Sequence, residues 1–460
     1  KGQQMREKTS LDQVMQARRD FIKAMLAAGI GGAGVGGVGN AFAADWAPWA
    51  IQPKGDPKSV NYVVWQFGKI YEQISRQFEK DWGVKVDPII EPNIEPQVAK
   101  LMSMYAAGSD IDVFNAPMQY IANEIDQGVA APLAGLPGLD AYLEDMTPLP
   151  KSIITREGKT WGLPYLSIAW CFFYNDELLT KAGFGGKPFS SWEELVEQCL
   201  KAKKDGVSEY PLLWVAGAAF DPLPGTWISQ VANRGGRLFA PDLTPELGPG
   251  SIARETLRFF QDTFLKHKIA DPDSLTLKYV PAVKVFNTGK HIYTGAMHNY
   301  FINLVNDPSQ SPIAGKAKIL GMPGDGRSVA VTWYYMLSSA TKNREWAWKM
   351  LQYLGGRTKD GEYVQAINLA KDAMLVPGYK SVLQNPSVRE TWSKRVDVDK
   401  MLEIFDKSVS MADTVPAMHA PWYPKWNDML NVELTACLRG QITPDVACDN
   451  MIANVKKAKA

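Results

Sequence analysis

Aromatic side chains with polar atoms gather in residues 157–195, beside several glycines and prolines. Tyr and Trp rings suit a surface that is apolar on one side and wet on the other. Sugar recognition needs such flat faces, together with polar groups that converge on the hydroxyls. Tyr165 and Trp170 are therefore candidate ligand contacts, and packing in a core is the alternative for each.

Two pairs of neighbouring carboxylates could in principle do acid–base chemistry. Asp176 and Glu177 form one pair, and Glu193 and Glu194 the other. Glycoside hydrolysis needs two carboxylates that flank the scissile bond. Both pairs, however, open predicted helices, where the positive end of the helix dipole already accounts for acidic side chains. No G-x-S-x-G, H-E-x-x-H or Ser/His/Asp pattern accompanies them. We therefore do not expect an enzyme.

Metal and cofactor motifs receive little support from the sequence. It contains four His, and its four Cys include no C-x-x-C pair, so no zinc site is expected. The G-x-G-x-x-G of residues 32–37 precedes a cleavage site instead of joining a strand to a helix, so no cofactor is expected. Disulfides between Cys437 and Cys448 or between Cys171 and Cys199 stay open, because spacing does not fix connectivity.

Residues 1–43 read as a targeting segment. Arg18 and Arg19 precede a short, glycine-rich apolar run, and an A-x-A cleavage site ends at Ala43. The paired arginines resemble a twin-arginine export signal, which predicts a periplasmic product. An uncleaved membrane anchor is the alternative, but the apolar run is too short for it. Without its six basic and three acidic residues the chain keeps 44 Lys and Arg against 46 Asp and Glu, a formal charge of −2. A chain with this balance of charges has no excess of basic residues that would favour binding to nucleic acid.

Strand and helix patterns alternate after residue 59. Apolar runs at residues 60–65, 84–90 and 112–116 predict strands, and helical periodicity follows each of them. Such alternation predicts an α/β fold with mostly parallel sheets flanked by helices. Ligands of such sheets bind beyond the carboxyl ends of the strands. The loops that hold Gln66, Phe67, Asn115 and Gln119 are therefore expected at a cleft.

Several short motifs occur in an order and spacing that resemble one family. They occupy residues 78–86, 108–113, 158–164, 174–179, 188–195, 287–290, 341–343 and 438–444. Together they resemble the family 1 extracellular solute-binding proteins, the maltose-binding type that serves ABC importers. The resemblance spans residues 60–454. It implies a two-lobed type II periplasmic-binding-protein fold, with one lobe from residues 59–166 and 332–372 and the other from residues 167–331 and 373–460.

The resemblance also implies ligand-binding positions in the cleft between the lobes. Carried over motif by motif, these are Gln66, Phe67, Asn115, Gln119, Trp227, His298, Tyr300, Trp422 and Tyr423. Two departures shift the expected specificity away from maltodextrin. The first loop lacks an acidic–basic pair, and His298-Asn299-Tyr300 stands where a Trp-rich turn is common.

The expected function is that of a periplasmic binding component of an ABC importer. It would capture a carbohydrate or polyol by hinge closure and deliver it to the membrane permease, as a monomer. Three alternatives stay open: a secreted enzyme of the glycoside hydrolase type, a binder of glycerol phosphodiester compounds, and a secreted lectin-like protein without a transporter.

Overall fold

The computed structural model describes residues 47–65, 68–92 and 94–460. The expected targeting segment and the candidate residues Gln66 and Phe67 lie outside these ranges. Within them, no helix is both long enough and apolar enough to cross a membrane.

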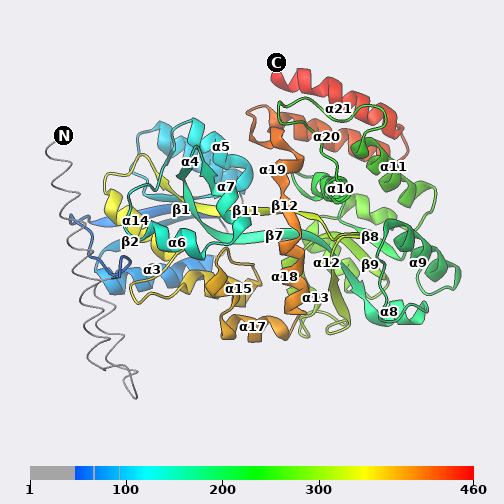
Figure 1. The fold of residues 1–460 in the computed structure, drawn as a ribbon, viewed down its shortest axis with the longest axis horizontal. Coiled ribbons are helices and arrows are strands. Elements are labelled where there is room, and N and C mark those ends of the chain that lie inside the picture. The colour runs from blue at the N-terminus through cyan, green and yellow to red at the C-terminus, as the bar shows by residue number, and fades with distance from the viewer. Residues whose placement is uncertain (1–46, 66–67, 93) are drawn as a thin grey trace, which may run out of the picture.

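One large mixed sheet runs through both halves of the molecule (Figure 1). Its strand order is β2 (Lys85–Glu91), β1 (Ser59–Trp65), β3 (Val113–Pro117), β11 (Ser328–Ser338), β7 (Gly162–Asn175), β9 (Tyr293–His298) and β8 (Leu212–Trp214). Short strands join it beside β7 and β11: β4 (Ala130–Ala131), β10 (Ala317–Leu320) and β12 (Ser408–Ser410). A separate hairpin pairs β5 (Thr155–Arg156) with β6 (Lys159–Thr160). The predicted α/β class is confirmed.

Strands β7 and β11 connect the two halves. β7 has 14 residues; its first part pairs with β11 and its last part with β9. The outer pairs β1–β2, β1–β3 and β8–β9 are parallel, as the alternation predicts. The central pairs β3–β11, β11–β7 and β7–β9 are antiparallel. The reason is that β7 and β11 cross between the halves in opposite directions.

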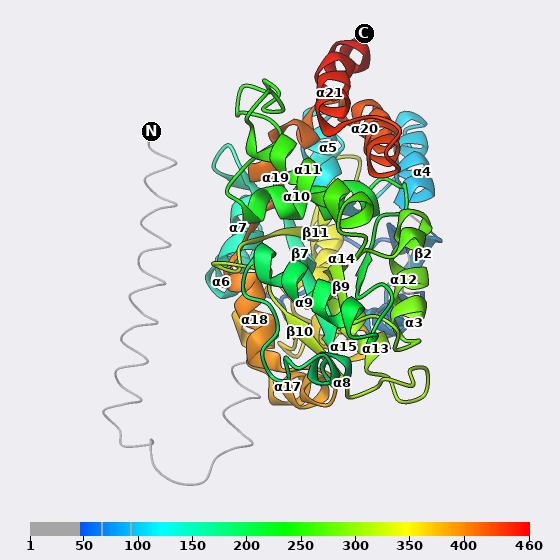
Figure 2. The ribbon, with the colours of Figure 1, turned by 90° about the vertical axis from the view of Figure 1, so that its right-hand side faces the viewer.

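Helices cover the sheet in each half (Figures 1 and 2). The "β1 half" denotes strands β1–β3 with α3 (Gly68–Trp82), α4 (Ile94–Ala106), α5 (Met118–Asp126), α6 (Leu139–Asp145), α7 (Pro148–Ile154), α14 (Arg344–Gly355) and α15 (Val364–Ala373). The "β9 half" denotes β8–β10 with α8 (Asp176–Lys181), α9 (Trp192–Lys204), α10 (Pro222–Asn233), α11 (Ile252–Leu265), η1 (Pro272–Thr276), α12 (Tyr279–Phe286), η2 (Asn299–Phe301), α13 (Ile302–Val305), α20 (Tyr423–Leu438) and α21 (Pro444–Lys459). Between them lie α16 (Lys380–Leu383), α17 (Pro386–Ser393), α18 (Val398–Asp406), α19 (Met411–Thr414) and η3 (Pro416–His419).

Local sequence signals account for several of these elements. The apolar face of α3, with Ile70, Ile74 and Phe78 spaced four residues apart, is buried. Ser191 is the N-cap of helix α9, and its hydroxyl accepts a hydrogen bond from the backbone N–H of Glu194. The carboxylate of Glu194 accepts in return from the N–H of Ser190, which completes a reciprocal cap.

The four cysteines are buried free thiols in this structure. Cys171 lies in β7 and Cys199 in α9, whereas Cys437 and Cys448 lie in the neighbouring helices α20 and α21. Neither of the two disulfides left open by the sequence is therefore formed here.

Candidate functional site

A cavity of about 430 Å³ lies where β7 and β11 cross between the halves. Its floor consists of Ile168 and Trp170 from β7 and of Val331 and Trp333 from β11. Alternate residues of a strand point to the same face, so each strand contributes two side chains to this floor. Val331 pairs with Ile168 in the strand register, which brings the two pairs together. The volume lies within the usual range of small-molecule sites.

The wall from the β1 half is aromatic. Trp65 ends β1, and its ring centroid lies 4.8 Å from that of Trp333. Tyr165 lies behind this pair, with its ring 6.2 Å from that of Trp333 and stacked at 4.4 Å on Tyr335. The amide of Asn115 donates a hydrogen bond to the Tyr165 hydroxyl over 3.2 Å. Gln119, in the first turn of α5, adds an amide to the lining.

The wall from the β9 half centres on Asp221, the residue before α10. Its Oδ2 accepts a hydrogen bond from the Tyr279 hydroxyl over 2.9 Å and lies 3.3 Å from Nε2 of His298. His298 is buried, with its ring 3.9 Å from that of Tyr279 and 4.7 Å from the perpendicular indole of Trp170. Among the described residues, neither nitrogen of this ring has a hydrogen-bond partner, and Asp221 approaches it without hydrogen-bond geometry. The histidine is thus held mainly by ring packing.

Three tyrosines around the carboxylate stay protonated. Burial raises the pKa of Tyr279, Tyr300 and Tyr423 above the ordinary phenol value, and the negative charge of Asp221 raises each of them further. All three line the cavity. Their hydroxyls therefore remain available as hydrogen-bond donors and acceptors over the whole neutral range.

Gly225 lets the Asp221 carboxylate and the Trp170 indole approach the same turn of α10. A Cβ at this position would lie 3.0 Å from Oδ1 of Asp221 and 2.9 Å from Nε1 of Trp170. Any larger residue would therefore force one of these two groups away from the cavity.

The structure brings together five of the eleven residues expected at the site. The cavity lining includes Gln119, Trp170, His298, Tyr300 and Tyr423. Asn115 and Tyr165 are fully buried and form a layer behind the aromatic wall. Gln66 and Phe67 lie outside the described residues.

Two predicted contacts are found elsewhere. Trp227 is 0 % exposed, and its indole N–H donates to the carbonyl of Ala253, so it belongs to the packing of α10 on α11. Trp422 is half-buried before α20, with its ring 5.8 Å from that of Phe239 and the ammonium of Lys459 over it. Neither residue lines the cavity, and both pack within the β9 half.

Sequence reasoning missed Trp65, Trp333, Asp221 and Tyr279. Asp221 stands in a Pro- and Gly-rich loop before a helix, which is a usable signal for a site residue. Trp65 ends a predicted strand, where the carboxyl-end rule applies. Trp333 and Tyr279 carry no local signal, because only the register of β11 and the packing of α12 turn them toward the cavity.

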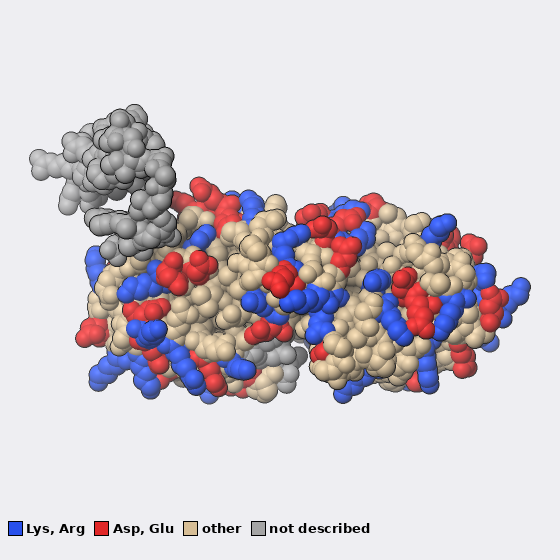
Figure 3. Space-filling view, turned by 90° about the horizontal axis from the view of Figure 1, so that it is seen from below, with Lys and Arg blue, Asp and Glu red and all other residues tan. Residues whose placement is uncertain are grey.

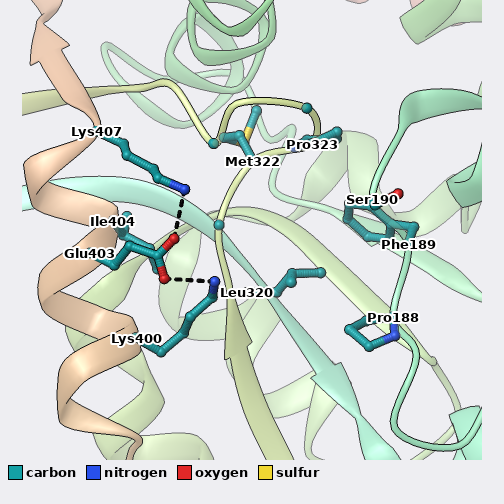
Figure 4. A pocket seen from close by; sticks show the side chains of 13 residues that line it. Pro188, Phe189, Ser190, Leu320, Met322, Pro323, Lys400, Glu403, Ile404 and Lys407 are labelled. Carbon is teal, nitrogen blue, oxygen red and sulfur yellow. Dashed lines mark hydrogen bonds and ion pairs between the residues drawn. The ribbon is translucent and has the colours of Figure 1, made fainter.

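A second hollow of about 260 Å³ lies beside α18 (Figure 4). Glu403 contacts Lys400 at 2.8 Å and Lys407 at 2.6 Å, and these partners lower the pKa of its carboxyl to about 2. The three charges largely satisfy one another, and Phe189 is the aromatic residue of the lining. The cavity at the strand crossing is therefore the better candidate for ligand binding.

No group of His, Cys, Asp and Glu suited to a metal ion occurs in the described part of the chain. Acidic and basic side chains are interspersed over the face seen from below (Figure 3).

Comparison with protein families gives a match to the bacterial extracellular solute-binding proteins over residues 65–358. The chain belongs to this family. The family that the sequence motifs predict is thereby confirmed. A protein of Brucella abortus that is named only as a binding protein is 24 % identical to this solute-binding protein over 321 residues, which are 66 % of this chain and 74 % of the relative.

Solved structures share the fold of this solute-binding protein. Maltose-bound MalE3 of T. maritima superposes with a TM-score of 0.71 and 21 % identity, covering 86 % of this chain and 99 % of its own. An ABC transporter solute-binding protein of Agrobacterium vitis S4, solved with bound D-mannitol, superposes with a TM-score of 0.69 and 18 % identity, covering 87 % and 98 %. At these identities the likeness concerns the fold.

Proposed function

We propose that this protein is the substrate-binding component of an ABC importer and captures a carbohydrate or polyol in the cavity at the β7–β11 crossing. The observation that carries the proposal is the composition of that cavity. Trp65 and Trp333 offer indole rings from one side, and Asp221 with its tyrosines offers convergent polar groups from the other. Sugar rings and polyol chains match both surfaces, through their C–H groups and their hydroxyls.

The family and its structural neighbours support this assignment. The relatives from T. maritima and A. vitis hold maltose and D-mannitol, respectively. Proteins with this fold thus bind a sugar in one case and a polyol in the other. This agrees with a site in which the side chains around the ligand select among hydroxylated compounds.

Closure about β7 and β11 is the proposed means of capture. The expected lobe boundaries fall between residues 166 and 167 and between residues 331 and 332. Ser167 and Thr332 are partners in the strand register, and their hydroxyls are 2.9 Å apart. Both boundaries therefore meet at one point of the sheet, which supports a hinge there. Hinge closure of two domains around a ligand is an established switching mode.

Binding without turnover is proposed in place of the glycoside hydrolase alternative. Hydrolysis of a glycosidic bond needs two carboxylates beside the ligand, and in the described lining Asp221 is the acidic residue. Glu177 pairs with Lys181 and Lys316 at 2.7 and 2.6 Å instead. A glycerol phosphodiester is disfavoured as well, because the basic residue of the lining, Lys278, is exposed and no arginine accompanies it.

Location and partners follow from the proposed role. Export to the periplasm through the segment of residues 1–43, docking of the loaded protein on a membrane permease, and a monomeric state are all part of the proposal. Their support is the membership in a family of extracellular binding proteins.

Calorimetric titration of the purified protein with sugars, polyols and glycerol phosphodiesters tests the assignment. We expect binding within the first two classes, and NMR of the recovered ligand should find it chemically unchanged. Absence of binding across both classes, or conversion of the ligand, would refute the proposed function.

A further inference from the structure

The carboxylate of Asp221 has no Lys or Arg partner among the described residues. Its side chain is 34 % exposed, and the cationic group within 4 Å of it would be a protonated His298. No Lys or Arg of the described residues makes an ion pair with it, whereas Glu177, Asp445 and Glu403 each have such a partner. Lys278, which also lines the cavity, is exposed to solvent. A cationic ligand group placed beside this partly exposed carboxylate would be attracted to it.

Several aromatic side chains line the same cavity as this carboxylate. Tyr279, Tyr300 and Tyr423 line the same cavity as Asp221, and the Tyr279 hydroxyl donates a hydrogen bond to its carboxylate. The Trp170 indole approaches the same glycine as Asp221 does. A carboxylate inside a set of aromatic rings is an environment that stabilises an organic cation, because the ring faces are negative and desolvate the ion.

Neutral ligands would use only part of this environment. A hydroxyl can donate one hydrogen bond to Oδ1 of Asp221, but it leaves the charge uncompensated. An ammonium group donates charge-assisted hydrogen bonds, which are about twice as strong as neutral ones. The geometry thus favours a ligand with a cation placed at Asp221 and a hydroxylated body that reaches Trp65 and Trp333.

We infer that the preferred ligands are amine-bearing carbohydrates or polyols, in which a protonated primary or secondary amine pairs with Asp221. This inference rests on the proposed function and narrows its substrate class.

Matched ligand pairs test the inference on the unmodified protein. D-Glucitol is compared with 1-amino-1-deoxy-D-glucitol, and D-glucose with D-glucosamine and N-acetyl-D-glucosamine, by calorimetry at pH 7. We expect the amine to bind about tenfold more tightly than its hydroxyl counterpart in at least one pair. The advantage should shrink as salt is raised, since it is electrostatic, and N-acetylation should abolish it.

The variant Asp221→Asn assigns the effect to one side chain. It keeps the shape and removes the charge, so the ratio of amine to hydroxyl affinity should fall to about one. Asp140→Asn, the same change at an exposed position of α6, should retain the wild-type ratio. Circular dichroism checks that both variants are folded. If Asp221→Asn does not fold, the ligand pairs and their salt dependence, measured on the wild type, still test whether the amine is preferred.

The outcomes distinguish failure of the amine preference from failure of the proposed function. Equal or tighter binding of the hydroxyl ligands would overturn the amine preference and leave the proposed function standing. Failure of both the amine and the hydroxyl ligands to bind would instead refute the proposed function.

Discussion

Trp65 and Trp333 pack against each other beside the cavity, with ring centroids 4.8 Å apart and planes inclined by 54°. One ring ends β1 and the other belongs to β11, so both are fixed by the sheet. A ligand that enters the cavity meets an aromatic wall that is already in place. Such preorganisation lowers the entropy lost on binding.

Replacement of Trp333 by Ala should weaken ligand binding by about 1–2 kcal/mol, because a stacking face is removed. Trp422→Ala is the matched control, since its ring packs on Phe239 away from the cavity. The control should change the dissociation constant by less than about twofold. Calorimetry with the same ligand measures both. If both variants lost the same amount of binding free energy, Trp333 would not be a ligand contact.

Glu124→Gln should make the stability of the protein less dependent on pH. Glu124 is buried in α5, and neither carboxyl oxygen has a hydrogen-bond partner in the part of the chain that the structure describes. Burial raises the pKa of this carboxyl to about 8. The neutral form is therefore favoured in the folded protein, and the stability it provides is present below the unfolded pKa and lost as pH rises through the folded one.

Urea unfolding at pH 5 and pH 8 measures this effect. Over this interval the wild type should lose on the order of a few kcal/mol relative to Glu124→Gln. Glu197→Gln, at an exposed position of α9, should follow the wild type. Parallel pH profiles for the wild type and Glu124→Gln would contradict the assignment.

Lys349→Met should alter the pH dependence in the opposite direction. The ammonium of Lys349 donates to the carbonyls of Pro48 and Trp49 and lies over the Trp82 ring. Burial, with a smaller effect of Lys359, lowers the pKa of this amine to about 7. The unfolded chain binds more protons between that value and the ordinary lysine range, so wild-type stability should rise with pH across it.

Thermal unfolding at pH 7 and pH 9 tests this prediction. The rise in midpoint should be smaller in Lys349→Met than in the wild type, whereas Lys204→Met, at an exposed position, should keep it. An unchanged rise in Lys349→Met would mean that the amine stays charged in the folded protein.

The four thiols should be inert in the folded protein. Burial raises the pKa of Cys171 and Cys199 far above the usual thiol range, and that of Cys437 and Cys448 to about 12. Since the thiolate is the reactive species, the reduced protein should release no colour from Ellman's reagent until guanidinium unfolds it, and then four equivalents. Two equivalents from exported protein would instead reveal a disulfide.

The sequence predicts the fold better than the site, for a physical reason. The apolar face of α3 and the cap of α9 depend on neighbours within four residues, so they can be read locally. The position of an aromatic ring relative to a cavity depends on packing between distant segments. Trp227 and Trp333 illustrate the difference: one is turned into the core of α10 and α11, the other toward β1, and no local pattern distinguishes them.

The long strand β7 also bears on how the protein can be divided. Its two ends belong to different halves, and Ser167 finds its partner Thr332 165 residues further along the chain. No single cut of the polypeptide therefore releases either half as a continuous fragment. The β7–β11 pair forms only after β11 has been synthesised, and contacts of this separation make folding slow. Fragments cut in a surface loop should regain binding only when mixed, as complementing halves of one sheet.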